Sequence, residues 1–331
     1  MDNFWGVEEE QNNFRKANVL EDMKSYEDYK FNMIYSDPPY NLGSTWYIDP
    51  VDGKYKIKKK ADFMNKWDGL DEDDIDTFFK EGYRVLKHGG WLIMYSMDRQ
   101  IGPMLYYAQK NGFVQHQSLY WYFISSFPKA TDASKMVDKR LGKMGDIDIT
   151  KSKSKEGKLL EGYKYSIAPL KQVVETILVF KKPHKNKSCL DDMIEYLKNP
   201  DLATYQPKVA KKERNAGLEL EPDKIIKSNQ LNSKACINDT RNTTNSKEFV
   251  AKNSHPTLKP IELNNKITSL FKLPKELNQY VYVPFSGVMS EYIGLLKAGY
   301  NPDNIWTCEI NDEYYETGLK RVDYWKEKYG H

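Results

Sequence analysis

The chain has 331 residues, of which 40% are hydrophobic and 13% aromatic, so it can bury about three-quarters of its unfolded surface in one large domain, or in one domain with an insertion. Lysine and arginine number 50 against 47 aspartate and glutamate, which leaves a net charge of +3. This balance excludes a strongly basic protein, and any polyanion site must therefore come from local clustering of charge.

The cysteines and the N-terminal residues further restrict the class of protein to which the chain can belong. Cys189, Cys236 and Cys308 have no CxxC or Cys/His spacing, which argues against a disulfide framework and a zinc site, so we expect reduced thiols and no metal. Residues 1–14 are acidic and lack an apolar core, and no segment approaches the roughly 20 apolar residues of a membrane span. We therefore expect a soluble, cytoplasmic protein.

In the first half of the chain, short apolar runs alternate with amphipathic segments. The expected elements, in chain order, are a strand at 31–35, a helix at 74–86, a strand at 91–95, a helix at 101–109 and a strand at 118–124. Gly89 and Gly90 are expected to end the first helix, and Asn111 and Gly112 the second. This alternation predicts an α/β sheet.

The second half interrupts this pattern and then restores it. Residues 151–158 are polar and of low complexity, and we expect a loop there, whereas residues 184–253 are rich in Lys, Asn and Ser. The other expected elements are strands at 173–180, 281–283 and 305–309 and helices at 190–197, 290–298 and 313–325. The sequence therefore predicts a doubly wound, mostly parallel α/β sheet with an inserted region at 184–253.

The segment SDPPYNLG directly follows the first expected strand. Asp37 provides a carboxylate and Tyr40 an aromatic ring, while Pro38 and Pro39 restrict φ and contribute no N–H. A rigid loop of this kind suits a preorganised site. The alternative is an ordinary β-turn, because Asp-Pro-Pro is a common way to leave a strand, so this segment alone favours a functional site only modestly.

A second loop, VPFSG at residues 283–287, lies between an expected strand and an expected helix. This is the place where a doubly wound sheet binds a nucleotide-like cofactor against a helix N-terminus. Glu309 ends the next strand about twenty residues on, where nucleotide-binding folds place the acidic residue that accepts hydrogen bonds from ribose hydroxyls. Because the chain contains both loops, we interpret them as a functional site.

With DPPY before FSG, the chain resembles the permuted amino-methyltransferase family of DNA modification enzymes, in which a DPPY catalytic motif precedes an FxGxG cofactor motif. Further matching segments are VLKHGGWLIMYS at 85–96, the residues around Trp121, FPKATDASK at 127–135, SHPTLKP at 254–260 and EINDEYYETGLKR at 309–321. The resemblance implies S-adenosyl-L-methionine as cofactor. It also implies a catalytic half at 1–183, a target-recognition insert at 184–253 and a cofactor-binding half at 254–331.

The resemblance implies roles for individual residues. An exocyclic base amine is a poor nucleophile because its lone pair is conjugated with the ring. Asp37 and the Pro38 carbonyl would accept its hydrogen bonds on a loop that Pro39 stiffens, and Tyr40 would stack on the flipped base. On the cofactor side the implied residues are Asn18, Asp37, His255, Thr257, Lys259, Pro284, Phe285, Ser286, Gly287 and Glu309. For His255 the alternative is a capping or turn role.

Three positions depart from the family pattern. Val283 replaces an Asp before Pro-Phe, Met289 replaces the second Gly of FxGxG, and Asn18 replaces an Asp near the adenine of the cofactor, where Asn can still form a hydrogen bond. Val283 and Met289 motivate an alternative, a catalytically silent DNA-binding homologue. The intact Asp37 and Tyr40 argue against it.

The family places DNA recognition between its two halves, which corresponds to 184–253. The cations clustered there are Lys208, Lys211, Lys212 and Arg214. They either contact phosphates or form an ordinary solvated face. We expect double-stranded DNA as partner, and the sequence leaves open a homodimer and a cognate restriction endonuclease. DPPY favours N6 of adenine, since cytosine-N4 enzymes more often have SPPY; the cytosine amine and an RNA substrate are the alternatives.

Overall fold

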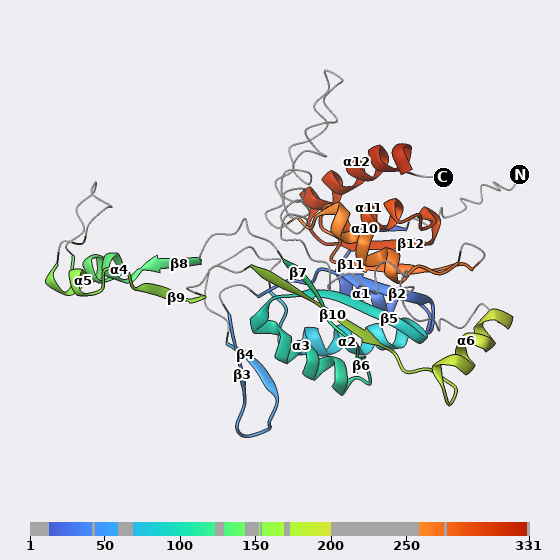
Figure 1. Cartoon of the computed structure of the whole chain (residues 1–331), viewed down its shortest axis with the longest axis horizontal. Coiled ribbons are helices and arrows are strands. Elements are labelled where there is room, and N and C mark those ends of the chain that lie inside the picture. The colour runs from blue at the N-terminus through green and yellow to red at the C-terminus, as the bar shows by residue number, and fades with distance from the viewer. Residues whose placement is uncertain are drawn as a thin grey trace, which may run out of the picture. The chain divides into compact units, whose positions relative to one another are not determined.

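The computed structural model describes residues 13–41, 44–58, 69–122, 129–142, 152, 154–168, 173–199, 258–274 and 277–329. The chain forms two compact units, one made of Met1–Leu119 with Thr176–His331 and a smaller one made of Tyr120–Glu175. The larger unit contains the central sheet and its helices (Figure 1). In the described part of the chain, no helix is both long and apolar enough to cross a membrane.

The central sheet is mostly parallel. Its strand order is β1 (Phe14–Lys16), β12 (Ile305–Glu309), β11 (Val281–Pro284), β2 (Phe31–Ser36), β5 (Leu86–Ser96), β10 (Val174–Lys181) and β6 (Val114–Gln115), with β7 (Leu119–Tyr122) also paired to β10. The first five strands run parallel, and β10 is antiparallel to both of its neighbours on this path. The predicted mostly parallel α/β sheet is thus confirmed.

Helices cover both faces of this sheet (Figure 1). One group consists of α1 (Val19–Lys24), α2 (Glu72–Val85) and α3 (Asp98–Lys110), and the other of α10 (Ile261–Leu270), α11 (Ser290–Lys297) and α12 (Asp312–Tyr329). Within each group, consecutive helices pack against each other. Among the described residues of this unit, the remaining helical elements are α6 (Cys189–Lys198) and the 3₁₀ turn η2 (Pro302–Asn304).

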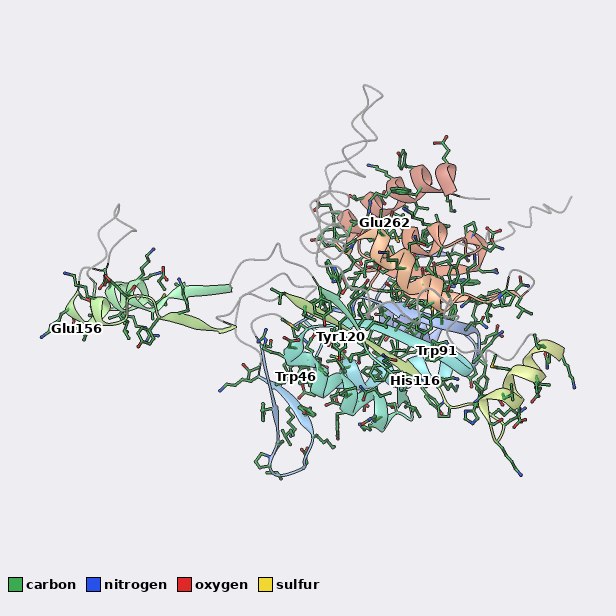
Figure 2. The ribbon with its side chains drawn as sticks, in the orientation of Figure 1. Trp46, Trp91, His116, Tyr120, Glu156 and Glu262 are labelled. Carbon is green, nitrogen blue, oxygen red and sulfur yellow. The ribbon has the colours of Figure 1, made fainter. Side chains whose placement is uncertain are left out.

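Strand β5 shows why both faces must be covered. Its side chains alternate between the two faces, as in any strand. Leu92 and Met94 join the core beneath α2 and α3, whereas the ring of Trp91 lies 5.1 Å from that of Phe271, just after α10 (Figure 2). All four side chains are almost completely buried. A strand buried on both faces has a continuous apolar sequence, which is typical of a central strand in a parallel sheet.

Most elements predicted from the sequence are confirmed within a few residues. The strand at 305–309 is found with the same bounds, and Asn111 and Gly112 end α3 as expected, with Gly112 at φ +94°. The other confirmed elements are β2, α2, β5, β7, β10, α6, β11, α11 and α12. Elements that the sequence analysis did not anticipate include the hairpin of β3 (Thr45–Ile48) and β4 (Tyr55–Lys58).

The prediction that Gly89 and Gly90 end the first long helix is wrong. Helix α2 ends at Val85 and β5 begins at the next residue, so both glycines lie inside the strand. A buried cation closes the helix instead. The Lys182 ammonium donates to the carbonyls of Tyr83 and Leu86 at 2.6 and 2.8 Å, which satisfies C-terminal helix carbonyls that would otherwise lack donors. Burial lowers the pKa of Lys182 to about 8.

The glycines have a different function, which is close packing of backbones. A Cβ atom on Gly90 would lie 2.8 Å from the Lys87 carbonyl oxygen and 3.1 Å from that of Asn32 on β2. Gly89 has φ +72°, and the pairing of β2 with β5 shifts register at this point. Glycine inside a strand commonly marks such an irregularity.

A second prediction, which concerns the smaller unit, is also wrong. Residues 151–158 were expected to form a loop, but Lys155–Leu159 form the short helix α5. Its N-cap is Ser154, whose hydroxyl oxygen accepts from the Gly157 N–H at 2.8 Å. The buried carboxylate of Asp138, on α4 (Ala133–Arg140), accepts from the Ser152 hydroxyl at 2.8 Å and from the Ser154 hydroxyl. The antiparallel pair β8 (Lys129–Asp132) and β9 (Lys164–Ala168) completes this unit.

Candidate active site

A cavity of about 250 Å³ opens where β2, β11 and β12 end. The carboxyl ends of parallel strands meet at one edge of a sheet, and ligands bind there in open α/β folds. The residues singled out from the sequence that line this cavity are Asn18, Asp37, Pro38, Pro39, Tyr40, Lys259, Phe285, Ser286, Gly287 and Glu309. Pro284 ends β11 just before the lining residues. The fold therefore brings both predicted loops to one cavity.

The Asp37–Tyr40 loop is held by hydrogen bonds at several points. The Tyr40 hydroxyl donates to Asp37 Oδ1 at 2.8 Å, and the Gln100 side chain donates to the Pro39 carbonyl at 3.3 Å. The next residue, Asn41, has φ +48° and accepts from the Leu70 N–H at 2.9 Å. These bonds and the two prolines fix the Asp37 carboxylate at the cavity wall.

Lys259 lies against this loop. Its ammonium donates to Asp37 Oδ2 at 2.8 Å and to the Tyr40 hydroxyl at 2.9 Å, and it lies 4.8 Å from the centre of the Tyr95 ring. The Lys259 side chain is 3% exposed and that of Asp37 15% exposed, so the ion pair is largely removed from water. The resemblance implied a cofactor-side role for Lys259, and in the structure its ammonium donates to both Asp37 and Tyr40 of the Asp37–Tyr40 loop.

The loop after β11 is shaped by unusual backbone angles. Phe285, Gly287 and Met289 all have positive φ, at 55°, 48° and 65°. The Gly287 N–H donates to Glu309 Oε2 at 2.7 Å, and the Asn311 N–H donates to Glu309 Oε1 at 2.8 Å. Burial raises the pKa of Glu309, while these backbone donors oppose the shift. A carboxylate offers about four lone-pair sites, so beside the backbone donors Asn311, Gly287 and Ile310, Glu309 can still accept a hydrogen bond from a ligand.

Asn18 has a structural role as well as its place at the cavity. It is the N-cap of α1, where its side-chain oxygen accepts from the Leu20 N–H at 2.8 Å. Two predicted cofactor-side residues, His255 and Thr257, lie outside the described residues. So do the predicted DNA contacts Lys208, Lys211, Lys212 and Arg214.

A buried polar cluster, which was not predicted from the sequence, lies behind the cavity. The hydroxyls of Tyr35 and Tyr95 lie 2.9 Å apart, and each lies 2.6 Å from Asn264 Oδ1. The Asn264 amide donates to Glu291 Oε1 at 3.5 Å, and Glu291 lines the cavity. Burial raises the pKa of both tyrosines, so their hydroxyls stay protonated. The available signal was an acidic residue in the otherwise apolar helix SEYIGLL.

Of the two departures from the family pattern near this loop, Val283 is a fully buried residue of β11, and Met289 is accommodated by a neighbouring helix. Met289 is fully buried in a left-handed conformation that costs a non-glycine residue about 1–2 kcal/mol. A Cβ atom on Gly318 of α12 would lie 2.6 Å from Met289 Cγ. The side chain at 289 therefore occupies space that the glycine at 318 leaves open.

We expect Met289→Gly to destabilise the protein although it removes backbone strain. Deleting a buried Met side chain costs about 2–5 kcal/mol, and strain relief offsets only about 1–2 kcal/mol of this. Urea denaturation should therefore show a net loss of unfolding free energy. Gly318→Ala should also destabilise the native chain, but less so in the Met289→Gly background, because the space is then empty. A gain in stability from Met289→Gly alone would contradict this packing.

Comparison with known proteins places this geometry in context. No curated protein matches the chain. Among solved structures, the chain is similar to M1.HpyAVI in complex with SAM, with 16% identity, coverage of 93% of this chain and 98% of that one, and a TM-score of 0.49. It is also similar to TTHA0409 from Thermus thermophilus, with 14% identity, coverage of 96% and 95%, and a TM-score of 0.46.

A third similar structure is the cytosine-N4-specific PvuII DNA methyltransferase, with 14% identity, coverage of 96% of this chain and 90% of that one, and a TM-score of 0.47. The family model described as DNA methylase, for N6 and N4 methyltransferases, matches residues 31–320. That range includes the Asp37 loop, Lys259, the loop after β11 and Glu309. Because the match spans most of the chain, the protein belongs to the N6/N4 DNA methylase family.

Proposed function

We propose that this protein transfers a methyl group from S-adenosyl-L-methionine to the N6 amino group of adenine in double-stranded DNA. The observation that carries the proposal is the position of Asp37. Its carboxylate, fixed by Tyr40 and Lys259, lines the same cavity as Gly287 and Glu309. An acceptor for a base amine and a nucleotide-type binding loop thus share one cavity.

The lining residues fit the cofactor. Glu309 has lone pairs for the two ribose hydroxyls, and Gly287 lets its backbone approach a ligand closely because it has no Cβ. Phe285, Leu70 and Val288 provide apolar surface of the kind that binds an adenine ring. When bound, S-adenosyl-L-methionine supplies an electrophilic methyl group on a sulfonium. All residues that the family resemblance implies for the cofactor remain proposals, namely Asn18, Asp37, His255, Thr257, Lys259, Pro284, Phe285, Ser286, Gly287 and Glu309.

The catalytic loop would act on the base. An amine N–H donates to the Asp37 carboxylate and to the Pro38 carbonyl, which increases electron density on the nitrogen as it becomes pyramidal. Tyr40 would stack on the base once it has left the duplex. The amine nitrogen would form a bond to the methyl carbon as the bond of that carbon to sulfur breaks and its electron pair stays on sulfur, and the nitrogen would lose one proton, for which Asp37 is a nearby acceptor. The remaining contribution is alignment of amine and methyl group.

The second candidate is methylation of the N4 amine of cytosine, because cytosine presents the same conjugated amine to the same pair of acceptors. The family to which the chain belongs includes both activities. DPPY favours adenine by resemblance. The proposed recognition region at 184–253, with Lys208, Lys211, Lys212 and Arg214, would position either duplex through its phosphates.

The test is transfer of labelled methyl from S-adenosyl-L-methionine to unmethylated duplex DNA, followed by nucleoside analysis. We expect N6-methyladenine. Detection of N4-methylcytosine would mean that the same mechanism acts on cytosine. Label in an RNA control but not in DNA would mean that the substrate is RNA. Binding of cofactor and DNA without transfer would instead indicate a catalytically silent homologue. Asp37→Asn in the same assay separates enzymatic transfer from background.

A further inference from the structure

Glu291 is a buried carboxylate at the cavity that neither predicted loop includes. It is the second residue of α11, it is 4% exposed, and it lines the cavity together with Asp37 and Lys259. In the described part of the chain, its one hydrogen bond from another side chain is the 3.5 Å contact from the neutral Asn264 amide, and its own backbone N–H also stabilises the ionised form. Among the residues that the structure describes, none forms an ion pair with it. A buried carboxylate with so few hydrogen-bond and ion-pair partners is unusual, because burying an unpaired charge costs free energy.

The charged and titratable groups facing Glu291 do not neutralise it. Asp37 adds a second negative charge, and Tyr35 and Tyr95 contribute neutral hydroxyls. Two cations, Lys259 and Arg321, are near and oppose the rise in the pKa of Glu291, but neither forms an ion pair with it in the described structure. Lys259 is bound to Asp37, and Arg321 donates to the Val288 carbonyl and, at 3.1 Å, to the Ser290 hydroxyl. Burial, and then Asp37, raise the pKa of Glu291 to about 7.

This arrangement leaves the part of the cavity wall around Glu291 with two carboxylates, those of Glu291 and Asp37, and the ammonium of Lys259; the lining also includes the carboxylates of Asp74 and Glu309. A ligand that brought a positive charge would restore the balance, and it would do so in a site of low dielectric where a charge pair is strong. We propose that Glu291 binds a positively charged group of the ligand in this cavity. This inference rests on the proposed function, in which the ligand carries two such groups, a sulfonium and an α-ammonium.

The proposal predicts a pH dependence of binding. A cation binds to the ionised form of Glu291, and the ligand-free carboxyl takes up a proton as the pH falls through about 7. Affinity for S-adenosyl-L-methionine should therefore be highest above this pH and should fall between pH 8 and pH 6. A ligand without a positive charge, 5′-methylthioadenosine, should bind with little change over the same range.

Isothermal titration calorimetry of the full chain tests the proposal with three ligands, which are S-adenosyl-L-methionine, S-adenosylhomocysteine and 5′-methylthioadenosine. We expect Glu291→Gln to weaken S-adenosyl-L-methionine binding at pH 8 by roughly 10- to 150-fold, the range for a lost charge-assisted hydrogen bond. An equal loss for S-adenosylhomocysteine identifies the ammonium as the bound group, and a loss confined to S-adenosyl-L-methionine identifies the sulfonium. Binding of 5′-methylthioadenosine should stay within about threefold in both cases.

Two results would overturn the proposal while the proposed function stands. One is unchanged affinity of Glu291→Gln for all three ligands, and the other is an equal loss for all three, which indicates a structural role. No binding of S-adenosyl-L-methionine to the native protein would overturn both. Glu262→Gln is the matched control, because Glu262 pairs with Lys297 on α11 and is not among the residues that line the cavity. If Glu291→Gln fails to fold, the pH dependence of native binding decides alone.

Discussion

Replacing Asp37 with asparagine should lower the rate of methyl transfer by roughly 10²–10³-fold, the loss found when one preorganised electrostatic group is removed from an active site. Asparagine keeps the shape of the side chain but loses the negative charge and one acceptor oxygen. The Lys259 ammonium and the Tyr40 hydroxyl would then compete with the base amine for a single acceptor. Single-turnover transfer of labelled methyl to DNA measures this effect.

Cofactor affinity is the control for this substitution. If Asp37 acts only on the amine, the dissociation constant of S-adenosyl-L-methionine should stay within about threefold of its native value. A loss of affinity as large as the loss of rate would place Asp37 in the cofactor pocket. Alanine is the poorer choice at this position, because it leaves the buried Lys259 ammonium without its partner and so costs about 3–5 kcal/mol of stability.

Replacing Glu309 with alanine should weaken cofactor binding by about 1.5–3 kcal/mol, which is roughly 10- to 150-fold in dissociation constant. The structure adds a second reason to the lost ribose contact. Glu309 accepts the N–H groups of Gly287 and Asn311, so its removal also releases the loop that shapes the cavity. Equilibrium binding by calorimetry or fluorescence measures the change.

Asp312→Ala is the matched control for Glu309→Ala. Asp312 lies three residues further along, its side chain is 81% exposed, and it pairs with Lys16 at the surface. Removing this carboxylate should leave cofactor affinity unchanged, since exposed ion pairs contribute little. If both substitutions weaken binding equally, the effect comes from the overall charge of this edge and Glu309 has no specific role.

Local sequence signals predicted much of the fold. Strand β12 was predicted with its observed bounds because its apolar run lies between a Pro-Asp-Asn turn and an acidic residue. The same rules failed at Gly89 and Gly90, where a helix stop and a strand irregularity have the same residue pattern. The buried Lys182 that ends α2 lies almost a hundred positions further along the chain, so no local window contains it.

The candidate site was predictable where it coincides with a motif, as at Asp37 and Glu309. It was not predictable where it depends on contacts between distant segments. Lys259 and Asp37 are 222 positions apart, and the Tyr35–Tyr95–Asn264 cluster joins three elements. Glu291 stands out only as a polar residue in an apolar helix, and its meaning depends on the charges that the fold places around it.

The pairing of β2 with β11 has a consequence for how the protein matures. Met33 and Val281 are register partners at the centre of the sheet, so β2 is made long before its neighbour exists. At the usual 5–20 residues per second, the ribosome needs roughly 10–50 s to reach β11. During this time the apolar strand has one side unpaired, and the nascent chain has no cofactor site. Because residues that follow β2, β11 and β12 all line the cavity, a ligand bound there should stabilise the completed sheet and protect newly made protein from proteolysis.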